Sequence, residues 1–134
     1  MRWAILLVAI GSLVAQSLDD TASERAVARF LAKCEEQGKA LWGRSLCGPL
    51  VIVNAETHWT VASEQDPDKK FEKRGNVWVG KLPSNFDVAN TAFDWGGRKW
   101  TMVMSPLPLD PYSQVSLVSH EAFHRIQEHL NLAG

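Results

Sequence analysis

The chain has 134 residues, of which 46% are hydrophobic and 22% are charged, and its formal net charge is −1. This length suits one domain with a hydrophobic core and is too short for two. A net charge so close to zero gives no indication of nucleic acid or of an anionic membrane as a partner.

The first 17 residues have the pattern of a secretory signal peptide. Arg2 supplies the positive start, and an apolar run over residues 3–14 follows it. Ala15-Gln16-Ser17 then places small residues where a signal peptidase requires them. The run is shorter than the roughly 20 apolar residues of a spanning helix. We therefore expect a secreted or periplasmic protein with no stable membrane anchor after cleavage, and a single domain over residues 18–134.

Cys34 and Cys47 are the only cysteines. An exported protein meets an oxidising compartment, which favours a disulfide between them. The alternative is two buried free thiols. No C-x-x-C motif and no cysteine zinc site is present.

A helix is predicted over residues 22–37, because Thr21-Ala22-Ser23-Glu24 has the form of a capping box and apolar residues follow at helical spacing. Gly38 is expected to end it. Short β-branched runs then predict strands at 50–53, 58–63 and 76–80, with an exposed polar loop at 65–70.

A β-hairpin is predicted at 91–104, where strands 91–95 and 98–104 flank Gly96-Gly97. Asp110-Pro111 has the form of a helix start, with Asp as the N-cap and Pro in the first turn, and the helix is expected to run from 111 to 132. The predicted fold is therefore α+β: an N-terminal helix, a small sheet of about five short strands, and a C-terminal helix.

The C-terminal helix carries an H-E-x-x-H motif, formed by His120, Glu121 and His124. Residues four apart lie one turn apart on one helix face, so the two imidazoles can bind a single Zn²⁺ ion. Glu121 is turned by one helical step, which suits a general base acting on a metal-activated water rather than a metal ligand. The motif therefore predicts His120 and His124 as metal ligands and Glu121 as the catalytic residue.

These residues and the order of the elements around them resemble the zincin metallopeptidases, over residues 91–130. The resemblance implies an exported zinc metallopeptidase acting on a peptide or protein substrate, with the sheet as the front half of a zincin-like domain. In zincins an edge strand receives the extended substrate, and residues 98–104 are the candidate for that strand.

The third zinc ligand does not follow from the motif. Metzincins continue with Gly and His where this chain has Gln127 and Leu130, and gluzincins take a Glu from a later helix. Glu128 is expected to be solvated or to hydrogen-bond a metal-ligating residue. His129 is expected to point away from His120 and His124. His58 is expected to be structural, with a role as the third ligand as the alternative. Two explanations follow: the natural protein continues past Gly134 in a gluzincin-like manner, or it is complete and binds metal weakly or not at all.

Two further hypotheses compete with the peptidase. In one, the domain binds a peptide or glycan without catalysis, in a groove formed by Trp59, Trp78, Trp95 and Trp100. In the other, the domain is purely structural and the two histidines are incidental.

Overall fold

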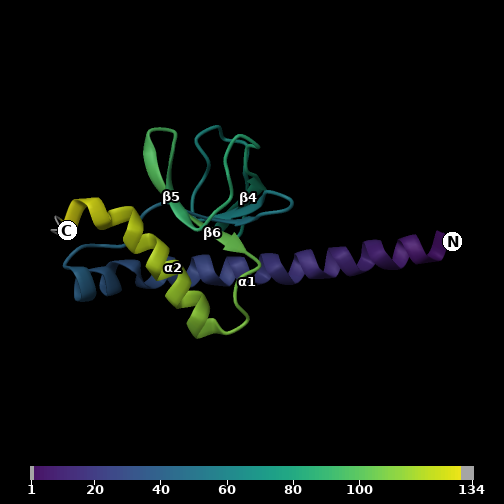
Figure 1. Ribbon diagram of the computed structural model, residues 1–134, viewed down its shortest axis with the longest axis horizontal. Coiled ribbons are helices and arrows are strands. Elements are labelled where there is room, and N and C mark those ends of the chain that lie inside the picture. The colour runs from purple at the N-terminus through teal and green to yellow at the C-terminus, as the bar shows by residue number, and fades with distance from the viewer. Residues whose placement is uncertain (1, 131–134) are drawn as a thin grey trace.

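The computed structural model describes the backbone of residues 2–130 and the side chains of residues 18–130. It confirms the α+β class, with a helix, a six-stranded mixed sheet and a second helix (Figure 1). The elements in chain order are α1 (Arg2–Trp42), β1 (Leu50–Asn54), β2 (Trp59–Ala62), β3 (Glu72–Arg74), β4 (Val77–Lys81), β5 (Thr91–Trp95), β6 (Arg98–Ser105), α2 (Pro111–Ile126) and the 3₁₀ helix η1 (Gln127–Leu130).

The predicted signal peptide at 1–17 lies outside the residues whose side chains are described. Within the described part of the chain, no helix is both long and apolar enough to cross a bilayer. The helix predicted over 111–132 is α-helical only to Ile126 and continues as the 3₁₀ helix η1 to Leu130, and its last two predicted residues lie outside the described range.

Helix α1 is longer at both ends than predicted. The expected capping box lies inside the helix, where Ser23 is buried, because no Gly or Pro interrupts the chain between residues 12 and 37. Gly38 does not end the helix either. A Cβ at Gly38 would lie 2.4 Å from the carbonyl oxygen of Arg44, so glycine is needed there for the following loop to pack closely. The helix ends at Trp42, and Gly43, with φ +67°, provides the left-handed cap.

The sheet has the strand order β3-β4-β2-β1-β6-β5. β1 and β6 are parallel, and every other neighbouring pair is antiparallel. β3 is absent from the prediction because Glu72, Lys73 and Arg74 are all charged and exposed, so they have none of the apolar alternation that marks a strand. It pairs with β4 across a turn at Gly75, where φ is +60°.

The hairpin of β5 and β6 is confirmed, with Gly96 and Gly97 both at positive φ in its two-residue turn. The expectation that residues 98–104 form an edge strand is wrong. β6 lies inside the sheet, because its other side pairs with β1 from Leu50↔Thr101 to Asn54↔Ser105. The edge strands are β3 and β5.

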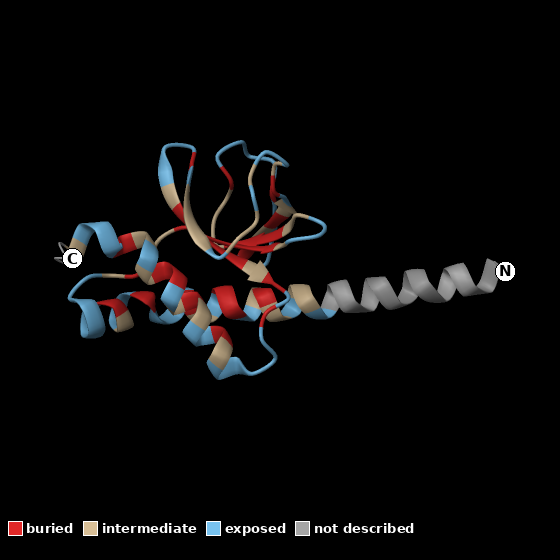
Figure 2. Cartoon of the chain, in the orientation of Figure 1, coloured by how far each residue is buried: buried red, intermediate tan, exposed pale blue. Residues whose placement is uncertain are grey.

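Apolar side chains cover both faces of the sheet. α1 and α2 lie together on one face, where Val27 and Val118 belong to the same core cluster as Ile52 (Figures 1 and 2). The opposite face carries an aromatic cluster built around Trp95 and Trp100. These two tryptophans are only 6% and 1% exposed, so they do not line the open groove expected of a tryptophan-rich binding face.

Candidate functional site

The helix that carries the motif starts where the sequence predicts. The Asp110 carboxylate accepts hydrogen bonds from the backbone N–H of Ser113 at 2.8 Å and from its hydroxyl at 2.9 Å, and Pro111 occupies the first turn. These bonds, the backbone one first, hold the pKa of Asp110 below its usual value. The cap fixes the rotation of α2 and therefore the direction in which each motif residue points.

One face of α2 is buried against the sheet and α1. Its buried residues are Gln114, Val118, Glu121, Ala122 and Ile126. Val115, one residue after the buried Gln114, is exposed. Glu121 is therefore the motif residue that faces the protein interior.

The two motif histidines converge at their outer nitrogens. Nε2 of His120 lies 3.0 Å from Nε2 of His124, with the rings nearly perpendicular. Two zinc–nitrogen bonds of about 2.05 Å at a tetrahedral angle would require a nitrogen separation of about 3.3 Å. The pair therefore needs only a small adjustment to hold one metal ion. Both histidines are exposed to solvent.

Glu121 lies beside this pair. Its carboxylate is 3.9 Å from Nε2 of His120, and its side chain is 9% exposed, against 63% for His120. Among the described residues, the motif thus places one carboxylate, shielded from most solvent, next to two converging imidazole nitrogens. Imidazole nitrogens are common zinc ligands, and carboxylates commonly transfer protons.

Among the residues whose side chains are described, none is brought to the pair as a third ligand. No cluster of three or more His, Cys, Asp or Glu residues suited to a metal ion occurs within the described part of the chain. His58 lies at the turn after β1, at the end of the sheet where β6 finishes and α2 begins. α2 then runs back toward the start of β6, so His58 and His124 lie near opposite ends of the sheet.

Glu128 is held by the sheet. Its carboxylate accepts a hydrogen bond from Nζ of Lys99 on β6 at 3.0 Å, and this bond lowers the pKa of Glu128. The same bond raises the pKa of Lys99. His129 lies on this side as well, with Nε2 3.8 Å from the Glu128 carboxylate. The exposed pair of Glu128 and Lys99 therefore ties η1 to β6, and His129 lies beside it.

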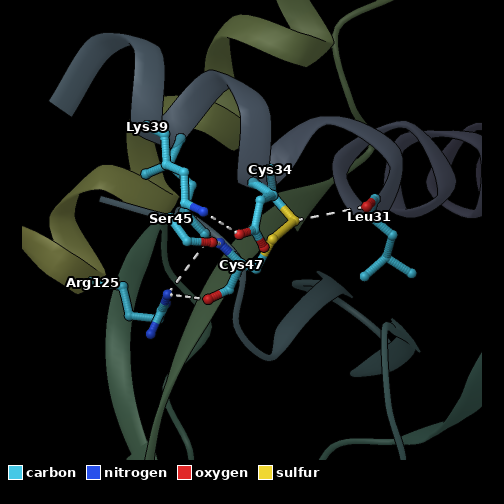
Figure 3. Close-up of a disulfide and its surroundings, with 8 residues drawn as sticks. Leu31, Cys34, Lys39, Ser45, Cys47 and Arg125 are labelled. Carbon is cyan, nitrogen blue, oxygen red and sulfur yellow. Dashed lines mark hydrogen bonds and ion pairs between the residues drawn. A yellow bond between two sulfur atoms is a disulfide. The ribbon is translucent and has the colours of Figure 1, made fainter. Parts of the chain in front are cut away.

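Cys34 and Cys47 form a disulfide, as the sequence favours (Figure 3). The bridge ties α1 to the loop that leads into β1. In Figure 3, Arg125 of α2 points to the same loop and donates hydrogen bonds to the carbonyl oxygens of Cys47 at 2.7 Å and Leu46 at 3.3 Å. Burial lowers the pKa of the Arg125 guanidinium. A Cβ at Gly48 would lie 2.4 Å from this guanidinium, so a larger residue there would displace the Arg125 side chain.

Two residues near the motif have roles that the sequence reasoning missed. Arg125 anchors the helix turn that carries His124, and no local pattern indicates a bond to a loop 78 residues away. The second is Gln127, whose Oε1 atom lies 2.9 Å from Nδ1 of His124. The spacing of three residues from a motif histidine on a helix is a pattern that could have identified it.

The described surface also has two hollows beside α1. One, of about 180 Å³, lies between α1 and α2, and a second, of about 460 Å³, lies beside the loop before α2. Arg29 and Gln114 line both, and Arg29 donates a hydrogen bond of 2.5 Å to Gln114. Neither hollow includes His120, Glu121 or His124 in its lining.

We compared the chain with protein-family models, with curated proteins and with solved structures, and none of the three comparisons finds a match.

Proposed function

We propose that this protein is an exported zinc-dependent hydrolase of peptide bonds, with His120 and His124 as metal ligands and Glu121 as the general base. The observation that carries the proposal is the approach of the two Nε2 atoms to 3.0 Å with the Glu121 carboxylate 3.9 Å from one of them. Neutral imidazoles at this separation suit zinc, and a carboxylate beside them suits proton transfer.

Bound zinc would supply Lewis acidity that polarises a water molecule and the substrate carbonyl. Glu121 accepts the proton that the water loses as its oxygen bonds to the carbonyl carbon. The same carboxyl then donates this proton to the amide nitrogen as the carbon–nitrogen bond breaks, which leaves a carboxylic acid and an amine. The small exposed fraction of the Glu121 side chain supports this role, because few water molecules compete for its proton.

The edge strand β5 is the element that we assign to substrate binding. In a hairpin with a two-residue turn, Trp95 and Arg98 form a hydrogen-bonded pair, so the alternate residues Ala92 and Asp94 turn their backbone groups outward. An extended peptide can add to such an edge as a further strand. α2 packs against β5, and this contact supports the proposal that a peptide paired with β5 lies near the motif.

Replacing Glu121 by Gln tests the mechanism. We expect E121Q to bind zinc as the wild type does and to lose peptide hydrolysis, because the amide cannot accept the proton. The matched control is E36Q, which removes a carboxylate from the exposed pair with Lys33 on α1 and should keep both properties. Hydrolysis retained in E121Q would refute the role of Glu121. Less than about a tenth of an equivalent of zinc in protein purified without chelator would refute the metal site.

Binding without catalysis is the second candidate function, and the two hollows beside α1 favour it. Arg25 and Arg29 line the larger hollow together with Asp19, Gln114 and mostly apolar residues, so its arginines outnumber its one carboxylate. A medium-chain carboxylate complements such a surface, with its chain on the apolar part and its charge on an arginine. Calorimetric titration with decanoate, with decanol as the neutral control, tests this function. Saturable binding that R29Q removes would favour it over catalysis.

A further inference from the structure

Three side chains at the end of α2 form a row of hydrogen-bonding groups. Oε1 of Gln127 lies 2.9 Å from Nδ1 of His124, and Nε2 of His124 lies 3.0 Å from Nε2 of His120. The imidazole rings are nearly perpendicular, with an interplanar angle of 87°. Each contact is short enough for a hydrogen bond, so each needs one donor and one acceptor.

The chemistry of the groups determines the direction of both bonds. The Gln127 oxygen has no proton and only accepts, so Nδ1 of His124 must donate. A neutral imidazole protonated at Nδ1 has its lone pair at Nε2. Nε2 of His124 therefore accepts, and Nε2 of His120 donates. The neutral pair consequently contains two different tautomers, with His124 protonated at Nδ1 and His120 protonated at Nε2.

We propose that Gln127 is a positioning residue that fixes the tautomer of His124 and prepares its Nε2 lone pair for a metal ion. The inference rests on the proposed function only for the metal. His120 has the opposite tautomer and must change before both Nε2 atoms can bind one ion. Its proton leaves Nε2 and a proton returns to Nδ1 through solvent, so the histidine pair releases no net proton.

Residues on either side of Gln127 in the chain are anchored to other segments, and these contacts restrict the position of the Gln127 backbone. Arg125 donates to the carbonyls of Leu46 and Cys47 on one side, and Glu128 pairs with Lys99 on the other. Gln127 itself retains helical angles, with φ −54° and ψ −41°. Its side chain therefore approaches His124 from one turn away. Partners of this kind orient metal-binding histidines, and their removal typically costs 10–100-fold in affinity.

The ring nitrogens can be observed directly by long-range ¹H–¹⁵N correlation in the ¹⁵N-labelled full chain. The spectrum is recorded without metal, at about pH 8.5, where histidine is neutral. We expect His124 to be protonated at Nδ1 and His120 at Nε2. In Q127L, which lacks the acceptor, we expect His124 to shift toward the Nε2-protonated form. In Q127E, whose carboxylate only accepts, we expect the wild-type tautomers. Q65L, in a distant loop, is the matched control and should leave both rings unchanged.

Zinc affinity is the second readout, measured by competition with a chromophoric chelator. We expect Q127L to bind zinc 10–100-fold more weakly than the wild type and Q127E to retain tight binding. A metal-free wild type with His124 protonated at Nε2 would overturn the inference, because it would mean that the Gln127 amide donates. Unchanged zinc affinity in Q127L would overturn the positioning role. If the wild type takes up no zinc, the proposed function fails, whereas the tautomers still decide whether Gln127 orients His124.

Discussion

Replacing Cys34 and Cys47 together by serine is expected to lower the melting temperature by about 12 °C. The bridge spans a sequence separation of 13 residues, for which the loop-entropy model gives about 3 kcal/mol of stabilisation at 25 °C. Unfolding entropy is about 2.1 cal/mol/K per residue, or about 0.24 kcal/mol/K over residues 18–130. Dividing the free energy by this entropy gives the expected shift.

Thermal unfolding followed by circular dichroism measures this shift, and a thiol assay in denaturant verifies the bridge. The wild type should show no free thiol before reduction and two after it. The matched control is S45A, which removes the hydrogen bond from the Cys47 N–H to the Ser45 hydroxyl and leaves the bridge intact. One hydrogen bond is worth about 1 kcal/mol, so S45A should melt no more than about 4 °C below the wild type. A double-serine variant that melts within about 3 °C of a fully bridged wild type would refute the reasoning.

Three further predictions follow from contacts around α2. R125M should destabilise the fold by about 1–3 kcal/mol in urea, because it leaves two loop carbonyls without their donor. The hydrogen bond with Lys99 lowers the pKa of Glu128 in the folded state. The stability that Glu128 contributes is therefore fully present above its ordinary pKa of 4.5. This stability is lost as the pH falls through the lowered pKa of the folded state. K99M should therefore return the Glu128 pKa toward its ordinary value in an NMR titration and weaken the acid dependence of unfolding. A92P should leave the hairpin folded but slow peptide hydrolysis, because it removes an N–H from the outer edge of β5.

Each of these predictions has an outcome that would contradict it. R98M, which removes an exposed pair with Glu64, should cost less than R125M, and an equal loss would contradict the anchoring role of Arg125. An unchanged Glu128 titration in K99M would show that Lys99 does not cause the shift. A92V keeps the backbone N–H, so hydrolysis equally slow in A92V and A92P would exclude main-chain pairing at β5.

Features that depend on neighbouring residues could be predicted from the sequence. Asp110 caps α2 because the bonds that it makes lie within one turn, and Gly96-Gly97 forms the hairpin turn because both residues adopt positive φ. The motif spacing likewise brings His120 and His124 together, since helical geometry alone sets the distance between residues four apart. In each case the energy that selects the structure is local.

Contacts between segments that are distant in the sequence determine the features that local patterns do not predict. Gly38 would end a helix by local preference, yet α1 continues because the returning loop packs on that glycine. β6 was expected at an edge and lies inside the sheet because it pairs with β1, whose partner residues lie 51 positions earlier in the chain. Glu128 pairs with Lys99, and Arg125 with the disulfide loop, for the same reason. Such pairings depend on which surfaces meet after the chain has collapsed. The sequence by itself therefore determined two imidazoles and a carboxylate on one helix, and the tertiary structure decided which strand, loop and ion pair surround them.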